Sequence, residues 1–254
     1  MELFSLHKQV AVVIGGSKGL GKGIASGLAI AGATVVLASR NQTELEQAAA
    51  EIRKATQGDV VALSVDITSI AAIQEFVNTV LTLKGSIDIL VNSAGINIRK
   101  KAVEFTEYDW DTVMDTQLKY VFFMNQVVGK AMIAQKVKGR IINVASLTSV
   151  LGLKGMVAYG SAKAGIVQMT KALANEWAEY GIRVNAIGPG YYRTDMTQSL
   201  FDDEKAVESM LGNIPLKRFG LPEDLIGTAI LLASDASAYI TGQVFYVDGG
   251  WLIE

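Results

Sequence analysis

The stretch VAVVIGGSKGLGKGIASGLAI, residues 10–30, decides the fold of this chain. Its first five residues are apolar and mostly β-branched, which predicts a buried strand. The glycine-rich turn GGSKGLG, residues 15–21, follows at once and leads into a helical pattern. Glycines allow a pyrophosphate to approach the backbone closely, and free N–H groups at a helix N-terminus stabilise its charge. The stretch therefore predicts a nucleotide-binding unit, although a plain glycine-rich turn has the same local sequence.

Strand-like and helix-like segments alternate along the rest of the chain. Apolar runs predict seven strands, over residues 10–14, 34–38, 60–65, 87–91, 140–145, 183–187 and 244–247. Helices are predicted between them, over residues 21–31, 43–55, 70–83, 109–135, 157–180 and 222–233. The strands are apolar on successive residues, which predicts a doubly wound parallel α/β sheet with helices on both faces. No linker-like composition divides the chain, so we expect residues 1–254 to form one domain.

Composition excludes several kinds of chemistry. The 254 residues include no Cys and one His, which excludes a disulfide framework, a cysteine nucleophile and a zinc–thiolate cluster. The single imidazole, His7, argues against a Ser-His-Asp triad or a multi-histidine metal site, so we expect no metal. With 23 basic and 25 acidic residues, we expect no nucleic-acid partner. The lack of a signal-like N-terminus or a membrane span predicts a cytoplasmic protein without a membrane partner.

A basic residue stands at the end of the second predicted strand. Units that bind NAD usually have an acidic residue there, which binds the ribose hydroxyls, whereas this chain has Ser39 and Arg40. A carboxylate would repel a 2′-phosphate, and Arg40 would attract it. Lys18, in the glycine turn, is a second cation within the same unit. Each cation alone could be a solvated surface charge, but together with the missing acid they predict NADP as the cofactor.

Three polar side chains are candidates for acid–base chemistry. Tyr159 and Lys163 are four residues apart in a predicted helix and therefore share one face. Because an ammonium favours a nearby phenolate, we expect Lys163 to lower the pKa of Tyr159 from its usual value near ~10. Ser146 follows the fifth predicted strand, where its hydroxyl could hold a substrate carbonyl. The Tyr-x-x-x-Lys spacing also occurs by chance on packed helix surfaces.

In order and spacing, these segments resemble the short-chain dehydrogenase/reductase family. The resemblance spans essentially the whole chain and adds NSAG at 92–95 and GPG at 188–190 to the segments above. It implies a Rossmann-type fold and hydride transfer between a nicotinamide and a carbonyl or alcohol carbon. It also implies that Tyr159 exchanges the proton, that Ser146 orients the carbonyl, and that Lys163 binds the nicotinamide ribose.

The resemblance implies a set of cofactor-binding residues as well. Asp66 is expected to meet the adenine, Asn92 and Gly95 the adenosine side, and Thr194 the nicotinamide amide. The full expected set is Gly15, Ser17, Lys18, Gly19, Leu20, Gly21, Ser39, Arg40, Asp66, Ile67, Asn92, Ala94, Gly95, Tyr159, Lys163, Pro189, Gly190 and Thr194.

Gln117 departs from the family pattern. The family usually has Asn at this position, where the amide shapes the helix and holds a water in the proton relay behind the lysine. We therefore count Gln117 with Ser146, Tyr159 and Lys163 as a catalytic residue. Its extra methylene could misplace the amide, and a displacement of ~1 Å can lower a rate on the order of a hundredfold. The alternative to a working proton relay is therefore an enzyme whose turnover Gln117 reduces.

The substrate is expected to be a small carbonyl or alcohol. The segments GINIR at 95–99 and YVDGGWL at 246–252 resemble gluconate 5-dehydrogenases and 2-deoxy-gluconate 3-dehydrogenases. Four cations surround the expected cleft: Arg99, Lys100, Lys154 and Arg193. Arg99 suits a bidentate pair with a sugar-acid carboxylate, so we expect Ser146, Tyr159 and Arg99 to bind the substrate.

Several alternatives stay open from the sequence. One is a 3-oxoacyl-carrier-protein reductase, and another is a nucleotide-binding oligomer with weak catalysis because of Gln117. Residues 191–215 fit either a mobile lid over the substrate or a helical excursion packed on the rim. By family analogy, apolar positions on the two long helices imply a homotetramer or a homodimer.

Overall fold

The computed structural model describes residues 2–194, 197, 201 and 203–253. Its described part contains a seven-stranded sheet in the order β3-β2-β1-β4-β5-β6-β7, with all neighbouring strands parallel. The strands are Val10–Ile14 (β1), Thr34–Ser39 (β2), Val60–Ser64 (β3), Ile89–Asn92 (β4), Arg140–Val144 (β5), Arg183–Pro189 (β6) and Val244–Val247 (β7). The strand order reverses between β1 and β4, which is where a sheet of this kind opens a crevice for ligands.

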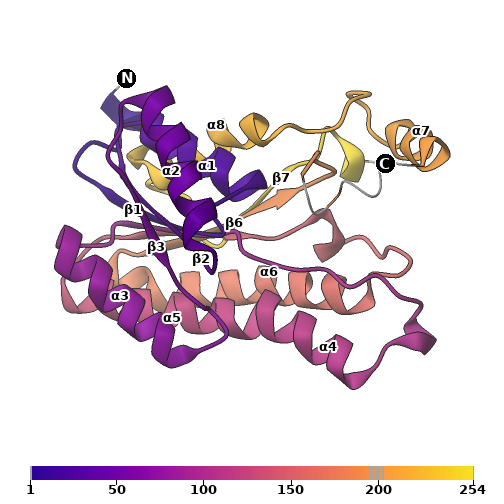
Figure 1. Ribbon diagram of the computed structural model, residues 1–254, viewed down its shortest axis with the longest axis horizontal. Coiled ribbons are helices and arrows are strands. Elements are labelled where there is room, and N and C mark those ends of the chain that lie inside the picture. The colour runs from indigo at the N-terminus through magenta and orange to yellow at the C-terminus, as the bar shows by residue number, and fades with distance from the viewer. Residues whose placement is uncertain (1, 195–196, 198–200, 202, 254) are drawn as a thin grey trace.

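Helices cover both faces of the sheet, as the sequence predicts (Figure 1). They are Gly19–Ile30 (α1), Gln42–Thr56 (α2), Ile70–Lys84 (α3), Glu107–Met114 (α4), Tyr120–Ala134 (α5), Val157–Trp177 (α6), Glu204–Gly212 (α7) and Ile226–Ala233 (α8). One buried apolar cluster joins the sheet to α1, α2 and α8, and a second joins it to α3, α5 and α6. Because both faces of the strands are buried, their sequences are apolar on successive residues.

Two segments differ from the sequence prediction. The helix expected over 109–135 is divided by a π-helical turn at Asp115–Lys119, which separates α4 from α5. Within 191–215, the structure contains the helix α7, whose N-cap Asp203 accepts hydrogen bonds from the backbone of Lys205 and Ala206. Residues 195, 196, 198–200 and 202 lie outside the described part, so the alternative of a lid stays open.

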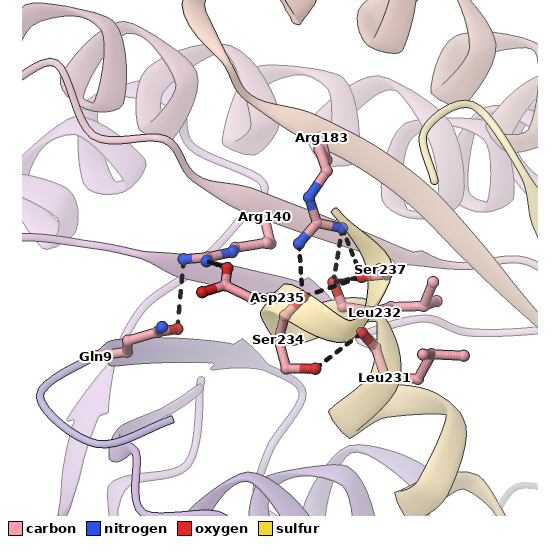
Figure 2. A network of polar contacts seen from close by, with 8 residues as sticks. All are labelled: Gln9, Arg140, Arg183, Leu231, Leu232, Ser234, Asp235 and Ser237. Carbon is pink, nitrogen blue, oxygen red and sulfur yellow. Dashed lines mark hydrogen bonds and ion pairs between the residues drawn. The ribbon is translucent and has the colours of Figure 1, made fainter. Parts of the chain in front are cut away.

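Two arginines anchor the end of α8 to the amino ends of β5 and β6 (Figure 2). The Arg183 guanidinium donates to the carbonyl oxygens of Leu232 and Ser234, at 3.3 and 2.9 Å, and to the Ser237 hydroxyl at 2.6 Å. These carbonyls belong to the last turn of the helix, where intrahelical partners are missing. Arg140 lies beside this group and binds Asp235 at 2.5 Å. The contacts hold the C-terminal end of α8 at the amino ends of β5 and β6, opposite to the cleft described next.

None of the helices within the described ranges has the length and apolar character that crossing a bilayer requires.

Candidate active site

A cleft of about 640 Å³ lies at the carboxyl ends of the central strands. Most of the expected cofactor residues line it: Gly15, Ser17, Lys18, Gly19, Leu20, Gly21, Ser39, Arg40, Asp66, Ile67, Ala94, Gly95, Tyr159, Lys163 and Thr194. The lining also includes residues that the sequence did not predict to bind the cofactor: Ile14, Asn41, Glu44, Val65, Thr68, Ser93, Ile96, Thr112, Thr116 and Val144. Several of them, such as Asn41 and Val65, lie at a helix start or just after a strand, whereas Thr112 and Thr116 lie in α4 and the π-helical turn after it.

The glycine turn is built for a close backbone approach. Gly15 has a φ of +80°, and a Cβ atom there would lie 2.6 Å from the backbone nitrogen of Ala94. A Cβ on Gly21 would lie 2.2 Å from the carbonyl oxygen of Gly15. A side chain at Gly15 would therefore push the turn away from the end of β4, and one at Gly21 would push α1 away from the turn. The turn leads directly into α1, so the free N–H groups at the start of that helix lie at the cleft.

One end of the cleft fits an adenosine that carries a 2′-phosphate. The Ser39 hydroxyl is buried and has no hydrogen-bond partner among the described residues, which leaves it available to a ligand. Arg40 follows it, and its charge reaches Asp66. Two hydrogen bonds from Thr68 lower the pKa of Asp66, and the Arg40 charge lowers it further. The unused Ser39 hydroxyl and the Arg40 guanidinium, which line this end of the cleft, are the groups there that can bind a 2′-phosphate.

The three expected catalytic side chains converge where β5 meets α6. Tyr159 lies in the first turn of α6, and Lys163 follows one turn later. The Lys163 Nζ donates to the carbonyl oxygen of Val144 at 2.6 Å and lies 5.6 Å from the centre of the Tyr159 ring. Ser146 is hydrogen-bonded to Tyr159. Its Oγ also accepts hydrogen bonds from the Thr148 backbone and hydroxyl, at 3.1 and 3.0 Å. The serine hydroxyl is therefore held toward the tyrosine.

Tyr159 does not have the lowered pKa that the sequence predicts. Burial raises the pKa of Tyr159 to about 12, while the hydrogen bond with Ser146 and the charge of Arg99 oppose this rise. Burial also lowers the pKa of Lys163 to about 7. Burial thus acts on both groups in the direction that favours their neutral forms. The sequence places the two side chains on one face of the helix. How far each is removed from water depends on the folded structure.

Gln117 lies in the π-helical turn between α4 and α5 and is 1% exposed. Its Nε2 donates to the carbonyl oxygen of Ile96, and its Oε1 is buried without a partner in the described part of the chain. A Cβ on Gly95 would lie 2.5 Å from both of these amide atoms. The amide therefore packs flat against the loop that follows β4. The glutamine thus holds the wall of the cleft at Gly95 and Ile96.

Three expected cofactor residues are not brought to the cleft. The side chain of Asn92 points into the core, where its Nδ2 donates to the Oδ1 atoms of Asn125 and Asn143, at 2.6 and 2.9 Å. Pro189 is the last residue of β6. The nitrogen of Gly190, which follows it, donates to the carbonyl oxygen of Val247 at 3.1 Å. These residues support strand ends rather than line the cavity. Asn92 and Asn143 are paired on the adjacent strands β4 and β5, and Asn125 joins them from α5.

The four cations expected around the cleft are not among the residues described as lining it, and they differ in their contacts. Lys100 is bound to Asp109 at 2.6 Å, and Arg193 stacks on Phe201 with its guanidinium carbon 4.5 Å from the ring centre. Lys154 is exposed. Arg99 is also exposed, its charge acts on Tyr159, and no ion pair engages it within the described ranges. Arg99 is therefore the cation that can meet an anionic group of a substrate bound at Tyr159.

Comparisons with known proteins agree with this geometry. The family model described as "Enoyl-(Acyl carrier protein) reductase" matches residues 15–252. A 2-dehydro-3-deoxy-D-gluconate 5-dehydrogenase of Escherichia coli (strain K12) is 44% identical over 99% of this chain and 98% of its own length. A 3-oxoacyl-[acyl-carrier-protein] reductase of Synechocystis is 40% identical over 98% and 99%.

A solved structure is similar over the whole chain. The gluconate 5-dehydrogenase of Burkholderia cenocepacia, in complex with NADP and tartrate, has a TM-score of 0.95, an identity of 34%, and coverage of 100% of this chain and 98% of that one. Sequence similarity, fold and family match extend across nearly all residues, including the glycine turn and the Tyr159–Lys163 pair. This chain is therefore an oxidoreductase of the short-chain dehydrogenase/reductase family.

Proposed function

We propose that this enzyme uses NADP(H) to transfer a hydride between the nicotinamide and a carbonyl or alcohol carbon of a sugar acid, such as gluconate or a ketogluconate. The observation that carries the proposal is the position of Arg99, whose charge acts on Tyr159 from an exposed site. A carboxylate on the substrate can pair with this guanidinium while a carbonyl of the same molecule meets the tyrosine. The names of the E. coli and Burkholderia relatives support the same substrate class.

The cleft has the groups that NADP needs. The bound cofactor would supply or accept the hydride. The glycine turn would hold its pyrophosphate, and Ser39 and Arg40 would hold the 2′-phosphate. Because an aspartate repels that phosphate, the Arg40→Asp enzyme should shift its preference toward NAD. The ratio of kcat/KM with the two cofactors measures this shift, and an unchanged ratio would count against the assignment.

In this proposal Tyr159 and Ser146 would bind the substrate oxygen. In the direction of reduction, the Ser146 hydroxyl orients the carbonyl oxygen, and the Tyr159 hydroxyl gives it a proton as the carbon gains a hydride. Burial makes the phenol a weak acid, so the phenolate that remains needs stabilisation. The Ser146 hydrogen bond and the Arg99 charge both lower the pKa of Tyr159 and so supply part of this stabilisation. Lys163, with a pKa of about 7, can return a proton to the phenolate at neutral pH.

The Arg99→Gln variant tests the substrate class. With 5-ketogluconate its KM should rise by about tenfold or more, because a charge-assisted hydrogen bond is lost. The KM for a neutral ketone should stay within about twofold of the wild-type value, since only the ionic contact changes. Lys154→Gln is the matched control, because it removes an exposed cation that has no assigned role. An unchanged KM for 5-ketogluconate in the Arg99 variant would refute the proposed role of this residue.

A reductase of 3-oxoacyl thioesters is the second candidate function. The Synechocystis relative at 40% identity favours it, and the same Ser146, Tyr159 and Lys163 would serve that reaction. Assays of NADPH oxidation with 5-ketogluconate and with an acetoacetyl thioester separate the two candidates. Saturable NADPH binding with turnover of neither compound would instead support the weakly catalytic nucleotide-binding protein.

The assembly, the domain organisation and the location remain proposals from the sequence. Exposed apolar side chains at α4 and before it, including Tyr108 at 77% and Val103 at 92%, favour a homotetramer or a homodimer. Sedimentation analysis would measure the subunit number.

One cooperative unfolding transition would support a single domain over residues 1–254, and cell fractionation would test the cytoplasmic location.

A further inference from the structure

The adenosine end of the cleft carries a negative side chain that the NADP assignment does not explain. Glu44 lines the cleft together with Arg40 and Asn41. It stands in the first turn of α2, and the Asn41 side chain accepts a hydrogen bond from the Glu44 backbone nitrogen at 3.2 Å. The cap fixes the start of α2, and with it the backbone of Glu44, on the same side of the cleft as Arg40.

Among the residues that the structure describes, other acidic side chains of this region have partners, whereas Glu44 has none. Asp66 accepts two hydrogen bonds from Thr68, at 3.0 and 2.7 Å. On α2 itself, Glu46 accepts a hydrogen bond from Gln42, and Glu51 binds Lys22. Among the described residues, neither a hydrogen bond nor an ion pair engages the Glu44 carboxylate. Its charge is therefore not neutralised by a direct contact and acts on what occupies the cleft.

We propose that Glu44 is a specificity-determining residue that repels the 2′-phosphate of NADP and so lets this enzyme use NAD as well. The inference rests on the proposed NADP-dependent function. Arg40 attracts the phosphate, and Glu44 and Asp66 lie along the same end of the cleft with the opposite sign. A 2′-phosphate adds negative charge that NAD lacks, so one carboxylate weakens NADP binding and leaves NAD binding nearly unchanged.

The test is calorimetric titration of the wild-type enzyme and the Glu44→Gln variant with NADP⁺ and NAD⁺. Glutamine keeps the size of the side chain and leaves the backbone cap intact, so only the charge is removed. We expect the Kd for NADP⁺ to fall by about threefold to tenfold and the Kd for NAD⁺ to change by less than about twofold. The gain should shrink at about 1 M salt, where screening acts over about 3 Å.

Glu46→Gln is the matched control. It makes the same charge change on the same helix, but Glu46 is not part of the cleft lining. We expect both dissociation constants to stay within about twofold of the wild-type values. Equal gains for NADP⁺ and NAD⁺ in the Glu44 variant, or no gain, would overturn the inference, as would a gain of the same size in the Glu46 variant.

The outcomes separate this inference from the proposed function. If the wild-type enzyme binds NADP⁺ and turns over 5-ketogluconate but the Glu44 variant keeps the same cofactor ratio, only the inference fails. If the wild-type enzyme binds neither dinucleotide, the proposed function fails and the inference fails with it.

Discussion

Replacing Gln117 by Asn, the residue usual in the family, should harm this protein rather than improve it. The Gln117 amide is buried, donates to the Ile96 carbonyl and packs against Gly95. Asparagine is one methylene shorter, so it cannot keep the same contact without movement of the loop or the π-helical turn. Loss of a buried methylene costs about 1 kcal/mol, and loss of the hydrogen bond costs about 1 kcal/mol more.

A loss of about 2 kcal/mol lowers the melting temperature of a chain of this size by about 4–8 °C. Because Gly95 and Ile96 form a wall of the cleft, a shift of ~1 Å there should also lower kcat by about tenfold to a hundredfold. Thermal unfolding and the rate of NADPH oxidation measure the two effects. The control is Gln135→Asn, which shortens an exposed glutamine that donates to the Gly85 carbonyl at 3.0 Å.

The opposite result is equally informative. If the Gln117→Asn enzyme were as stable as the wild type and faster, the glutamine would be a defect in the proton relay, and the packing argument would be refuted.

Three further predictions follow from the site and from the end of α8. Tyr159→Phe should lower kcat by about a thousandfold while the Kd for NADPH, measured by fluorescence titration, changes by less than about twofold. A retained rate would remove the tyrosine from the role of proton donor. For Lys163, burial lowers the pKa from 10.5 to about 7, so the unfolded chain binds more protons between these values and stability should rise with pH across that window. Melting temperatures at pH 7.5 and 9.5 measure the rise, which Lys163→Met should abolish, and an equal rise in both proteins would contradict this reasoning. Arg183→Met removes three hydrogen bonds at the end of α8 and should lower the free energy of unfolding, measured in urea, by about 2–4 kcal/mol. A decrease of less than about 0.5 kcal/mol would contradict the role given to these bonds.

The sequence by itself determined the order of the elements and the spacing of the Tyr159–Lys163 pair that we propose to be catalytic. The strands at Val10–Ile14 and Val244–Val247 have the bounds that their apolar runs predict, because burial on both faces leaves a local signal. The four-residue spacing of Tyr159 and Lys163 places both on one face of α6, since helix geometry is local. The glycine turn was predictable for the same reason.

Only the tertiary structure decided what surrounds these groups. Asn92 turns into a buried amide cluster, Lys100 is occupied by Asp109, and Glu44 faces the cleft without a motif to announce it. The pKa of Tyr159 rises rather than falls. Each of these results depends on which distant segments pack against a side chain and how much water they remove. Desolvation and long-range contacts are properties of the folded chain, and a linear pattern does not contain them.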